Sequence, residues 1–117
     1  MTRNQSRQLA ILVVDDSEIT RRVLTTRLTA RGASVVCASS MADALAVDAE
    51  GLTAAIVDVD LGPDSGVTLA DVLADRNPHL RLALFTAHDA HHDRKTFHKP
   101  DDVDAVVAWA LEAQSRD

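Results

Sequence analysis

Short apolar runs alternate along this chain with segments whose apolar positions recur at helical spacing. The runs are rich in β-branched residues and mostly apolar on both faces, which is typical of buried strands in a parallel sheet. We expect strands at 9–14, 34–38, 54–58, 80–85 and 96–98. The intervening segments predict helices at 17–31, from 39 or 40 to about 51, 66–76, and from 100 or 101 towards the end of the chain. Because strand and helix alternate, the pattern predicts an α/β fold with helices on both faces of a parallel sheet.

Local signals mark the helix ends and the side of each helix that is buried. Ser17 is a helix-capping residue, Gly32 suits the left-handed conformation in which helices end, and Asn77–Pro78 stops the third helix. In the first helix the apolar positions predict a wide buried arc of Ile19, Val23, Leu24 and Leu28. In the last helix they predict a buried stripe of Val103, Val106, Val107, Ala110 and Leu111. Trp109 lies roughly 130° from that stripe, so both a lone exposed side chain and a partner or dimer contact stay open.

The connection between the fourth and fifth strands is unusually short. Only nine residues run from Ala87 to Lys95. Returning along a strand requires about 17 Å, plus about 5 Å sideways. Nine helical residues would span only about 14 Å, whereas the same residues extended could span about 30 Å. We therefore predict a mostly irregular crossover with at most one helical turn.

Composition narrows the class of protein further. At 117 residues we expect one domain over 1–117, with a frayed segment at 1–8. The net charge of −6 and the dispersed arginines argue against a nucleic-acid surface. Cys37 is the only cysteine, so a reducing compartment is expected and Cys37 is interpreted as a small core residue. No apolar run is long enough to cross a bilayer and no signal segment is recognisable, so we expect a cytoplasmic protein without membrane contact.

Polar residues follow the predicted strands where a parallel sheet carries its chemistry. Asp15–Asp16, Asp58, Thr86 and Lys99 each lie at the carboxyl end of a different strand, and these ends meet at one edge. Converging carboxylates repel one another, and the usual remedy is a hard divalent cation, of which Mg²⁺ suits phosphate chemistry. We predict that Asp58 is a nucleophile for a phosphoryl group. Lys99 and Thr86 would each bind a phosphoryl oxygen.

Taken together, these motifs resemble those of a bacterial two-component response-regulator receiver domain. They are Ile11–Ser17, Asp58–Leu61 with Gly66 following, Thr86–Ala87 and Lys99–Pro100. The resemblance covers nearly the whole chain and implies a flavodoxin-like five-stranded sheet of order 2-1-3-4-5, with the fourth helix reduced or absent. It implies that Asp58 is the phosphoacceptor and that Mg²⁺ is held by Asp15, Asp16, Asp58 and the backbone carbonyl of Asp60. It also makes Thr86–Ala87 and Lys99 the phosphate-binding and switch residues. The implied donor is a phosphohistidine of a histidine kinase or a histidine phosphotransfer protein.

The chain departs from the family pattern outside the acidic residues. A full helix usually precedes the lysine, and an aromatic usually lies three positions before it, where this chain has Thr96. Phe97 is one position later, and we count it with Trp109 as a candidate partner surface. Gly62–Pro63 inverts the usual order in the loop after the phosphoacceptor. These departures concern the surface that partners contact rather than the site.

Several interpretations compete with this one. The histidines and aspartates at 88–93 could form a metal cluster, although a solvated loop is the favoured interpretation. Our leading hypothesis is a stand-alone receiver, not an enzyme, that acts on an unknown downstream protein without binding DNA. The alternative is a binding module of the same fold that needs no phosphorylation, and homodimerisation stays open. An aspartate-nucleophile phosphatase is disfavoured, because such enzymes resemble longer chains with a further acidic pair.

Overall fold

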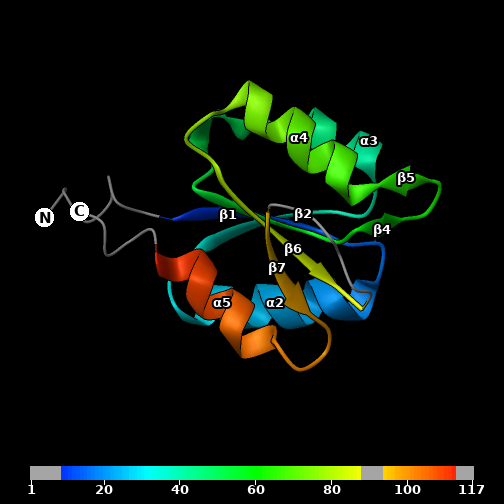
Figure 1. Cartoon of the computed structure of the whole chain (residues 1–117). Helices are drawn as coiled ribbons and strands as arrows, with labels where there is room; N and C mark the ends of the chain where they lie inside the picture. The colour runs from blue at the N-terminus through cyan, green and yellow to red at the C-terminus, as the bar shows by residue number, and fades with distance from the viewer. Residues whose placement is uncertain (1–8, 88–93, 113–117) are drawn as a thin grey trace, which may run out of the picture.

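The computed structural model describes residues 9–87 and 94–112, in which five parallel strands form one sheet (Figure 1). The strand order is β2-β1-β3-β6-β7, which confirms the predicted order 2-1-3-4-5. The strands are β1 (Ala10–Val14), β2 (Ser34–Ala38), β3 (Ala54–Val57), β6 (Arg81–Thr86) and β7 (Lys95–His98). A separate antiparallel hairpin of β4 (Asp60–Leu61) and β5 (Asp64–Ser65) follows β3. The expected sheet is therefore present, with small shifts at the strand ends.

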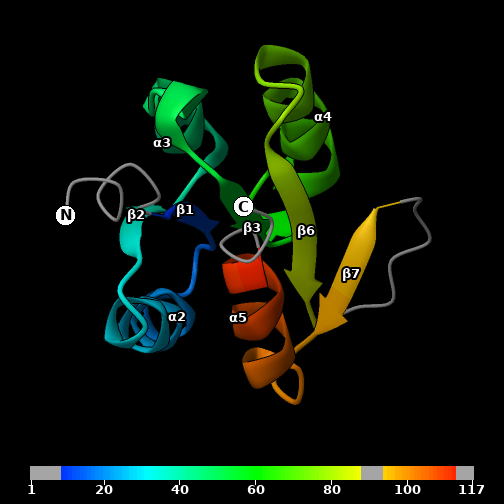
Figure 2. The same cartoon turned by 90° about the vertical axis from the view of Figure 1, so that its left-hand side faces the viewer.

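Helices cover both faces of the sheet, as the alternation predicts. Figures 1 and 2 show α2 (Glu18–Ala30) and α5 (Val103–Leu111) on one face, and α3 (Met41–Ala46) and α4 (Gly66–Arg76) on the other. Strand β1 supplies both cores, because Ile11 and Val13 pack towards α2 and α5, whereas Leu12 and Val14 pack towards α3 and α4. This burial on both faces explains why β1 is apolar without alternation. None of the helices in the described ranges is long and apolar enough to span a membrane.

Most helix ends follow the local signals, but two boundaries were wrong. Helix α3 ends at Ala46 rather than near residue 51, because Val47 is extended and a 3₁₀ helix, η1 (Ala49–Gly51), begins separately. The carboxylate of Asp48 caps that short helix by accepting from the Glu50 N–H at 3.0 Å. Helix α5 begins at Val103 rather than at 100 or 101.

A turn at the end of β7 delays the start of α5. The Asp102 carboxylate accepts from the His98 N–H at 2.8 Å, and the Asp102 N–H donates to the His98 carbonyl at 2.9 Å. Both backbone groups of His98 are thereby bonded within the turn. The chain completes this turn over 99–102 before it can continue as a helix.

Three side-chain placements predicted from the sequence were wrong. Ile19 is 77% exposed instead of buried, because the first turn of α2 lies beside the Lys99–Pro100 loop rather than over the sheet. Cys37 is exposed, because it lies on β2, an edge strand of the sheet. Trp109 is half-buried, and its ring packs on the Phe97 ring with centroids 6.1 Å apart.

The Phe97–Trp109 contact belongs to the core rather than to a free surface. Phe97 is only 9% exposed and lies in the same core cluster as Phe85, its register partner on β6. The Arg81 guanidinium lies over the Trp109 ring, 4.4 Å from its centroid, and donates to the Trp109 carbonyl at 2.8 Å. The predicted partner surface at Phe97 is therefore not exposed.

The short crossover between β6 and β7 is described only at its two ends. Neither Ala87 nor Arg94 is helical, and residues 88–93, with the predicted irregular path and the His–Asp cluster, lie outside the described residues. Arg94 pairs with Asp71 of α4 at 2.8 Å, which ties the entry of β7 to a neighbouring helix. Strand β7 then pairs with β6 in parallel from Ala83–Lys95 to Thr86–His98.

Candidate functional site

The predicted site residues lie at the carboxyl edge of the sheet, on the side of the β4–β5 hairpin (Figure 1). Backbone hydrogen bonds continue the strand pairing through each of them. The Asp15 N–H donates to Ala38 at 3.1 Å, and the Asp58 N–H donates to Val14 at 2.9 Å. The Lys99 N–H donates to the Thr86 carbonyl at 2.9 Å. The sheet therefore fixes the backbone from which each functional side chain extends.

The ammonium of Lys99 lies between two buried carboxylates. Its Nζ is 2.6 Å from Asp15 Oδ2 and 3.0 Å from Asp58 Oδ2. The side chains of Asp15 and Asp58 are 2% and 7% exposed, and that of Lys99 is 17% exposed. Residues from three different strand ends thus form one ionic cluster, as the sequence predicts, although the contact between Lys99 and Asp15 was not foreseen.

Backbone donors bind the remaining oxygens of the two buried carboxylates. Asp15 Oδ1 accepts from the Ser17 N–H at 2.9 Å, and Asp58 Oδ1 accepts from the Asp60 N–H at 3.2 Å. The Arg21 guanidinium also donates to the Asp15 carbonyl at 2.7 Å. Sequence reasoning gave Ser17 only a capping role, which it also has, and missed Arg21. An arginine one turn into a helix looks like an ordinary surface charge, so no sequence signal could have found it.

Burial and charge shift the acid–base equilibria of the central pair. Burial raises the pKa of the Asp58 carboxyl, and the nearby negative charge of Asp15 adds to this. The hydrogen bonds from Lys99 and the Asp60 N–H oppose the rise without cancelling it. For Lys99, burial alone would lower the pKa of the ammonium, but the hydrogen bonds to Asp15 and Asp58 outweigh burial and raise it. The cluster therefore holds a firmly protonated lysine beside a carboxylate whose charge is costly.

The acidic residues fit a hard divalent cation. Asp15, Asp16 and Asp58 can each place a carboxylate oxygen within 4.8 Å of the other two. Asp16 is exposed, so the set opens to solvent on one side. Carboxylate oxygens are the donors that Mg²⁺ and Ca²⁺ prefer, and an open side suits an ion that keeps water ligands. The geometry brings together the three predicted carboxylate ligands, whereas a role for the Asp60 carbonyl stays a prediction.

Gly66 lies against the backbone of Asp58, which gives the motif glycine a physical reason. A Cβ placed on Gly66 would lie 1.8 Å from the Asp58 carbonyl oxygen and 2.7 Å from its carbonyl carbon. The Gly66 N–H also donates to the Val59 carbonyl at 2.7 Å, which closes the loop around the β4–β5 hairpin. Within that hairpin, Gly62 has φ +63° at the turn it forms with Pro63. Only a glycine fits position 66 without displacing the backbone of Asp58.

Thr86 and Ala87 occupy the places that the sequence assigns to them. Thr86 ends β6 and is fully buried, whereas Ala87 is exposed. The carbonyl of Thr86 holds the backbone of Lys99, so the two residues are neighbours across the ends of β6 and β7. Their roles towards a phosphoryl group stay predictions.

An apolar groove of about 280 Å³ lies next to the ionic cluster. It runs between the first turns of α2 and the start of α5, and Lys99 contributes to its wall. Its apolar lining includes Ile19, Val23, Phe85, Pro100 and Val103. The exposed Ile19 is therefore part of a larger apolar surface beside the site.

Comparison with known proteins gives one family. The family model described as response regulator receiver domain matches residues 11–107. The sensor protein TorS of Escherichia coli (strain K12) is 38% identical over 82 residues, which cover 68% of this chain. The chain spans only 9% of the length of TorS.

Solved structures of receiver proteins share the fold. A response regulator protein from Burkholderia pseudomallei, with a phosphorylated aspartic acid, calcium ion and citrate, is 26% identical with a TM-score of 0.77. That alignment covers 92% of this chain and 69% of the other. The response regulator TrrA from Thermotoga maritima, in complex with Mg(2+)-BeF, is 21% identical with a TM-score of 0.80. The alignment with TrrA covers 91% of this chain and 99% of the other.

Proposed function

The chain belongs to the response regulator receiver domain family, and we propose that Asp58 accepts a phosphoryl group from a phosphohistidine of a partner protein. A receiver domain is a signalling module of two-component systems rather than a catalytic enzyme. The partner would be a histidine kinase or a histidine phosphotransfer protein. The signal would then pass to a downstream protein through contacts with the phosphorylated domain.

The placement of Asp58 carries this proposal. Its carboxylate is buried at the end of β3, beside the Lys99 ammonium at 3.0 Å and among the oxygens of Asp15 and Asp16. A surface aspartate with a merely structural role would not need three neighbouring charges at the edge where α/β sheets carry their chemistry. The raised pKa of Asp58 also fits a functional carboxylate, because perturbed groups gather at such sites.

Phosphoryl transfer at this site needs positioning and charge neutralisation more than acid–base chemistry. An oxygen of Asp58 forms a bond to phosphorus while the bond from phosphorus to the donor imidazole nitrogen breaks, and that electron pair stays on the nitrogen. Lys99 binds a phosphoryl oxygen as a point charge, and the Thr86 hydroxyl donates to another. A Mg²⁺ ion held by Asp15, Asp16 and Asp58 would offset the negative charge of the carboxylates and of the phosphoryl group. The Burkholderia structure, which has a phosphorylated aspartic acid and a calcium ion, and the Thermotoga structure in complex with Mg(2+)-BeF support this choice.

The apolar groove supports a protein donor. Ile19 is 77% exposed and lies in a groove with a mostly apolar lining, and contiguous apolar surfaces of this kind mark protein interaction sites. The groove reaches Lys99, so a protein that covers Ile19 and Val103 would lie close to Asp58. We assign this face to the phosphohistidine protein.

Acetyl phosphate tests the proposal without a cognate kinase. We expect the purified chain to gain one phosphoryl group in its intact mass when acetyl phosphate and Mg²⁺ are both present. Asp58→Asn should abolish the gain, whereas Asp64→Asn, an exposed carboxylate of the same loop, should retain it. If neither acetyl phosphate nor beryllofluoride modifies or binds the wild-type protein, the phosphoacceptor proposal fails and a phosphorylation-independent binding module becomes the better hypothesis.

A further inference from the structure

We infer that Lys99 keeps the cation site closed in the metal-free protein, so that a divalent cation binds only as the ammonium leaves Asp15. The inference rests on the proposed function, because it takes Asp15, Asp16 and Asp58 as the cation ligands. It adds that one residue has two opposing effects. Lys99 weakens cation binding and, once released from Asp15, becomes available to the phosphoryl group.

The hydrogen bonds of the two buried carboxylates carry this inference. The Lys99 ammonium binds Asp15 Oδ2 at 2.6 Å and Asp58 Oδ2 at 3.0 Å. The other oxygen of each carboxylate accepts a backbone N–H, from Ser17 and from Asp60. Every oxygen of Asp15 and Asp58 therefore already has a donor. The shortest of these contacts is to Asp15, not to the phosphoacceptor.

The ammonium is also the donor that can most readily leave. The Ser17 and Asp60 N–H groups are fixed by the backbone around them, whereas Lys99 reaches the carboxylates through a flexible side chain. The Lys99 backbone stays anchored by its hydrogen bond to Thr86. A cation that takes oxygens of Asp15 and Asp58 brings a second positive charge beside the largely buried ammonium, where like charges repel more strongly than in bulk water. Release of the ammonium from Asp15 relieves that repulsion.

This arrangement sets an order of events. While the ammonium bridges Asp15 and Asp58, two of its three N–H donors are held by these carboxylates, and the Asp58 oxygen that it binds is engaged. Once the ammonium has left Asp15, the same side chain can bind the incoming group beside Asp58. A lysine with a purely structural role would support cation binding by preserving the fold, which is the opposite expectation.

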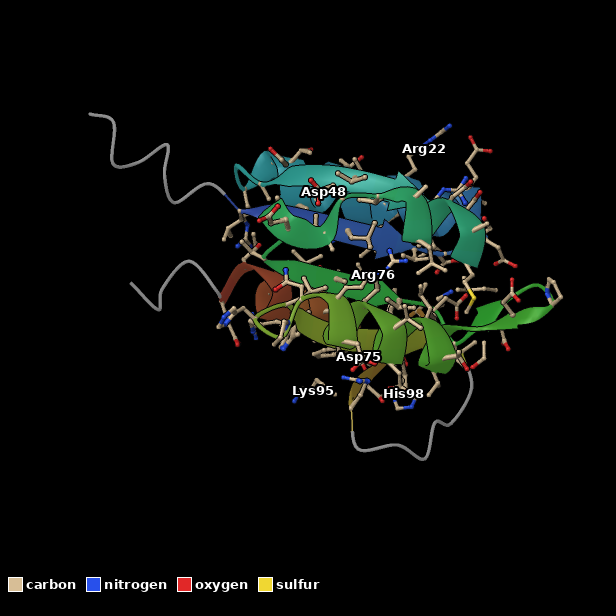
Figure 3. The ribbon with its side chains drawn as sticks, turned by 90° about the horizontal axis from the view of Figure 1, so that it is seen from above. Arg22, Asp48, Asp75, Arg76, Lys95 and His98 are labelled. Carbon is tan, nitrogen blue, oxygen red and sulfur yellow. The ribbon has the colours of Figure 1, made fainter. Side chains whose placement is uncertain are left out.

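Cation affinity measured without any phosphoryl donor tests the inference. We would titrate Mn²⁺ as a probe into the wild type, Lys99→Met and Lys95→Met, and follow the free ion by electron paramagnetic resonance. Lys95→Met removes the same charge from an exposed residue of β7 outside the ionic cluster (Figure 3). We expect Lys99→Met to bind Mn²⁺ about tenfold more tightly than the wild type, within the usual range of coupling between two ligands. Lys95→Met should stay within about twofold of the wild type, because only long-range charge changes.

A measurement on the wild type makes the test independent of how well Lys99→Met folds. Lys95 and Lys99 are the only lysines of the sequence, so their side-chain ¹³Cε signals are readily distinguished. Saturating Mg²⁺ should move the Lys99 signal and leave that of Lys95 in place. The inference is overturned if Lys99→Met binds Mn²⁺ no more tightly than Lys95→Met, or if bound Mg²⁺ leaves the Lys99 signal unchanged. Failure of acetyl phosphate to modify Asp58 would instead refute the proposed function. The Mn²⁺ affinities of Lys99→Met and Lys95→Met would still decide the inference about Lys99.

Discussion

Replacing Gly66 with alanine should lower the stability of the fold and displace the backbone of Asp58. The added Cβ would lie 1.8 Å from the Asp58 carbonyl oxygen, 2.7 Å from its carbonyl carbon and 3.0 Å from Val59 Cα. An ordinary contact needs about 3.5 Å, and the distance to the carbonyl oxygen is more than 1 Å shorter than this, so the backbone at Gly66 or at Asp58 must shift. The obstacle is main chain rather than a flexible side chain, and it carries the hydrogen bond from the Asp58 N–H to Val14.

The cost of that displacement can be estimated. Overpacking a rigid interior costs about 1 to 3 kcal/mol, and a shifted main-chain hydrogen bond adds about 1 kcal/mol. We therefore expect Gly66→Ala to lose about 3 kcal/mol of unfolding free energy. For a domain of this size, that loss corresponds to a thermal unfolding midpoint lower by roughly 10 to 20 °C. Beryllofluoride binding should weaken as well, because the carbonyl of Asp58 and its side chain move together.

Thermal unfolding monitored by circular dichroism measures the effect, and Gly51 provides the matched control. A Cβ on Gly51 meets nothing within 4 Å, and its φ is not in the positive range that favours glycine. Gly51→Ala should therefore change the unfolding free energy by less than about 1 kcal/mol. A Gly66→Ala protein that unfolds within about 2 °C of the wild type would show that Gly66 does not lie against the backbone of Asp58.

Three further outcomes follow from the same cluster and its surroundings. Asp58→Asn should raise the unfolding free energy by about 1 kcal/mol near pH 7, because burial raises the pKa of Asp58 and its charge is costly in the folded state. That gain should shrink as the pH falls through the raised pKa of Asp58, and it should vanish below the ordinary value of 3.8, where the wild-type carboxyl is protonated in both the folded and the unfolded state. Urea titrations at several pH values measure it. Mg²⁺ at a hundred times its dissociation constant should raise the unfolding free energy of the wild type by about 2.7 kcal/mol. Removal of the ion by EDTA should reverse this gain, and the Asp15→Asn protein should not show it. Arg81→Leu should change the fluorescence of Trp109, the single tryptophan, while costing under about 1 kcal/mol, because the guanidinium lies 4.4 Å above a half-buried ring.

Apolar pattern and strand-end chemistry were sufficient to predict the sheet and the acidic site. The apolar sequence of β1 predicts a strand buried on both faces, and its side chains do alternate between two cores. Asp58 follows β3, which is another fully buried apolar strand. Once strand and helix alternate, the carboxyl ends of the strands must share an edge, so Asp15, Asp58 and Lys99 could be placed together from the sequence. The capping role of Ser17 and the positive φ of Gly32 could also be predicted from the sequence.

Properties that depend on where an element lies in the fold could not be predicted in this way. Helical spacing placed Ile19 in a buried arc, but spacing does not say how far the first turn of α2 extends beyond the sheet. Cys37 follows two valines, yet its exposure depends on β2 being an edge strand. Trp109 lies off the apolar stripe of α5, but Phe97 of β7 and Arg81 of β6 approach it from the sheet and contact its ring.

The contact between Lys99 and Asp15 illustrates the same limit within the site. The resemblance assigns Lys99 to the phosphoryl group, and the sequence gives no reason to prefer one carboxylate over the other as its partner. Only the distances of 2.6 Å and 3.0 Å show that Lys99 binds two predicted cation ligands at once. The question of when the cation site opens therefore arises from the structure alone.

Locating the phosphoryl group after reaction with acetyl phosphate and Mg²⁺ would show directly whether Asp58 is the phosphoacceptor. Borohydride reduces an aspartyl phosphate but not a free carboxylate, and tandem mass spectrometry of the resulting peptides identifies the reduced residue. We predict that Asp58 is the modified residue and that Asp15, Asp16 and Asp60 are untouched. Modification of any other aspartate, or of none in a folded protein that binds Mg²⁺, would contradict it.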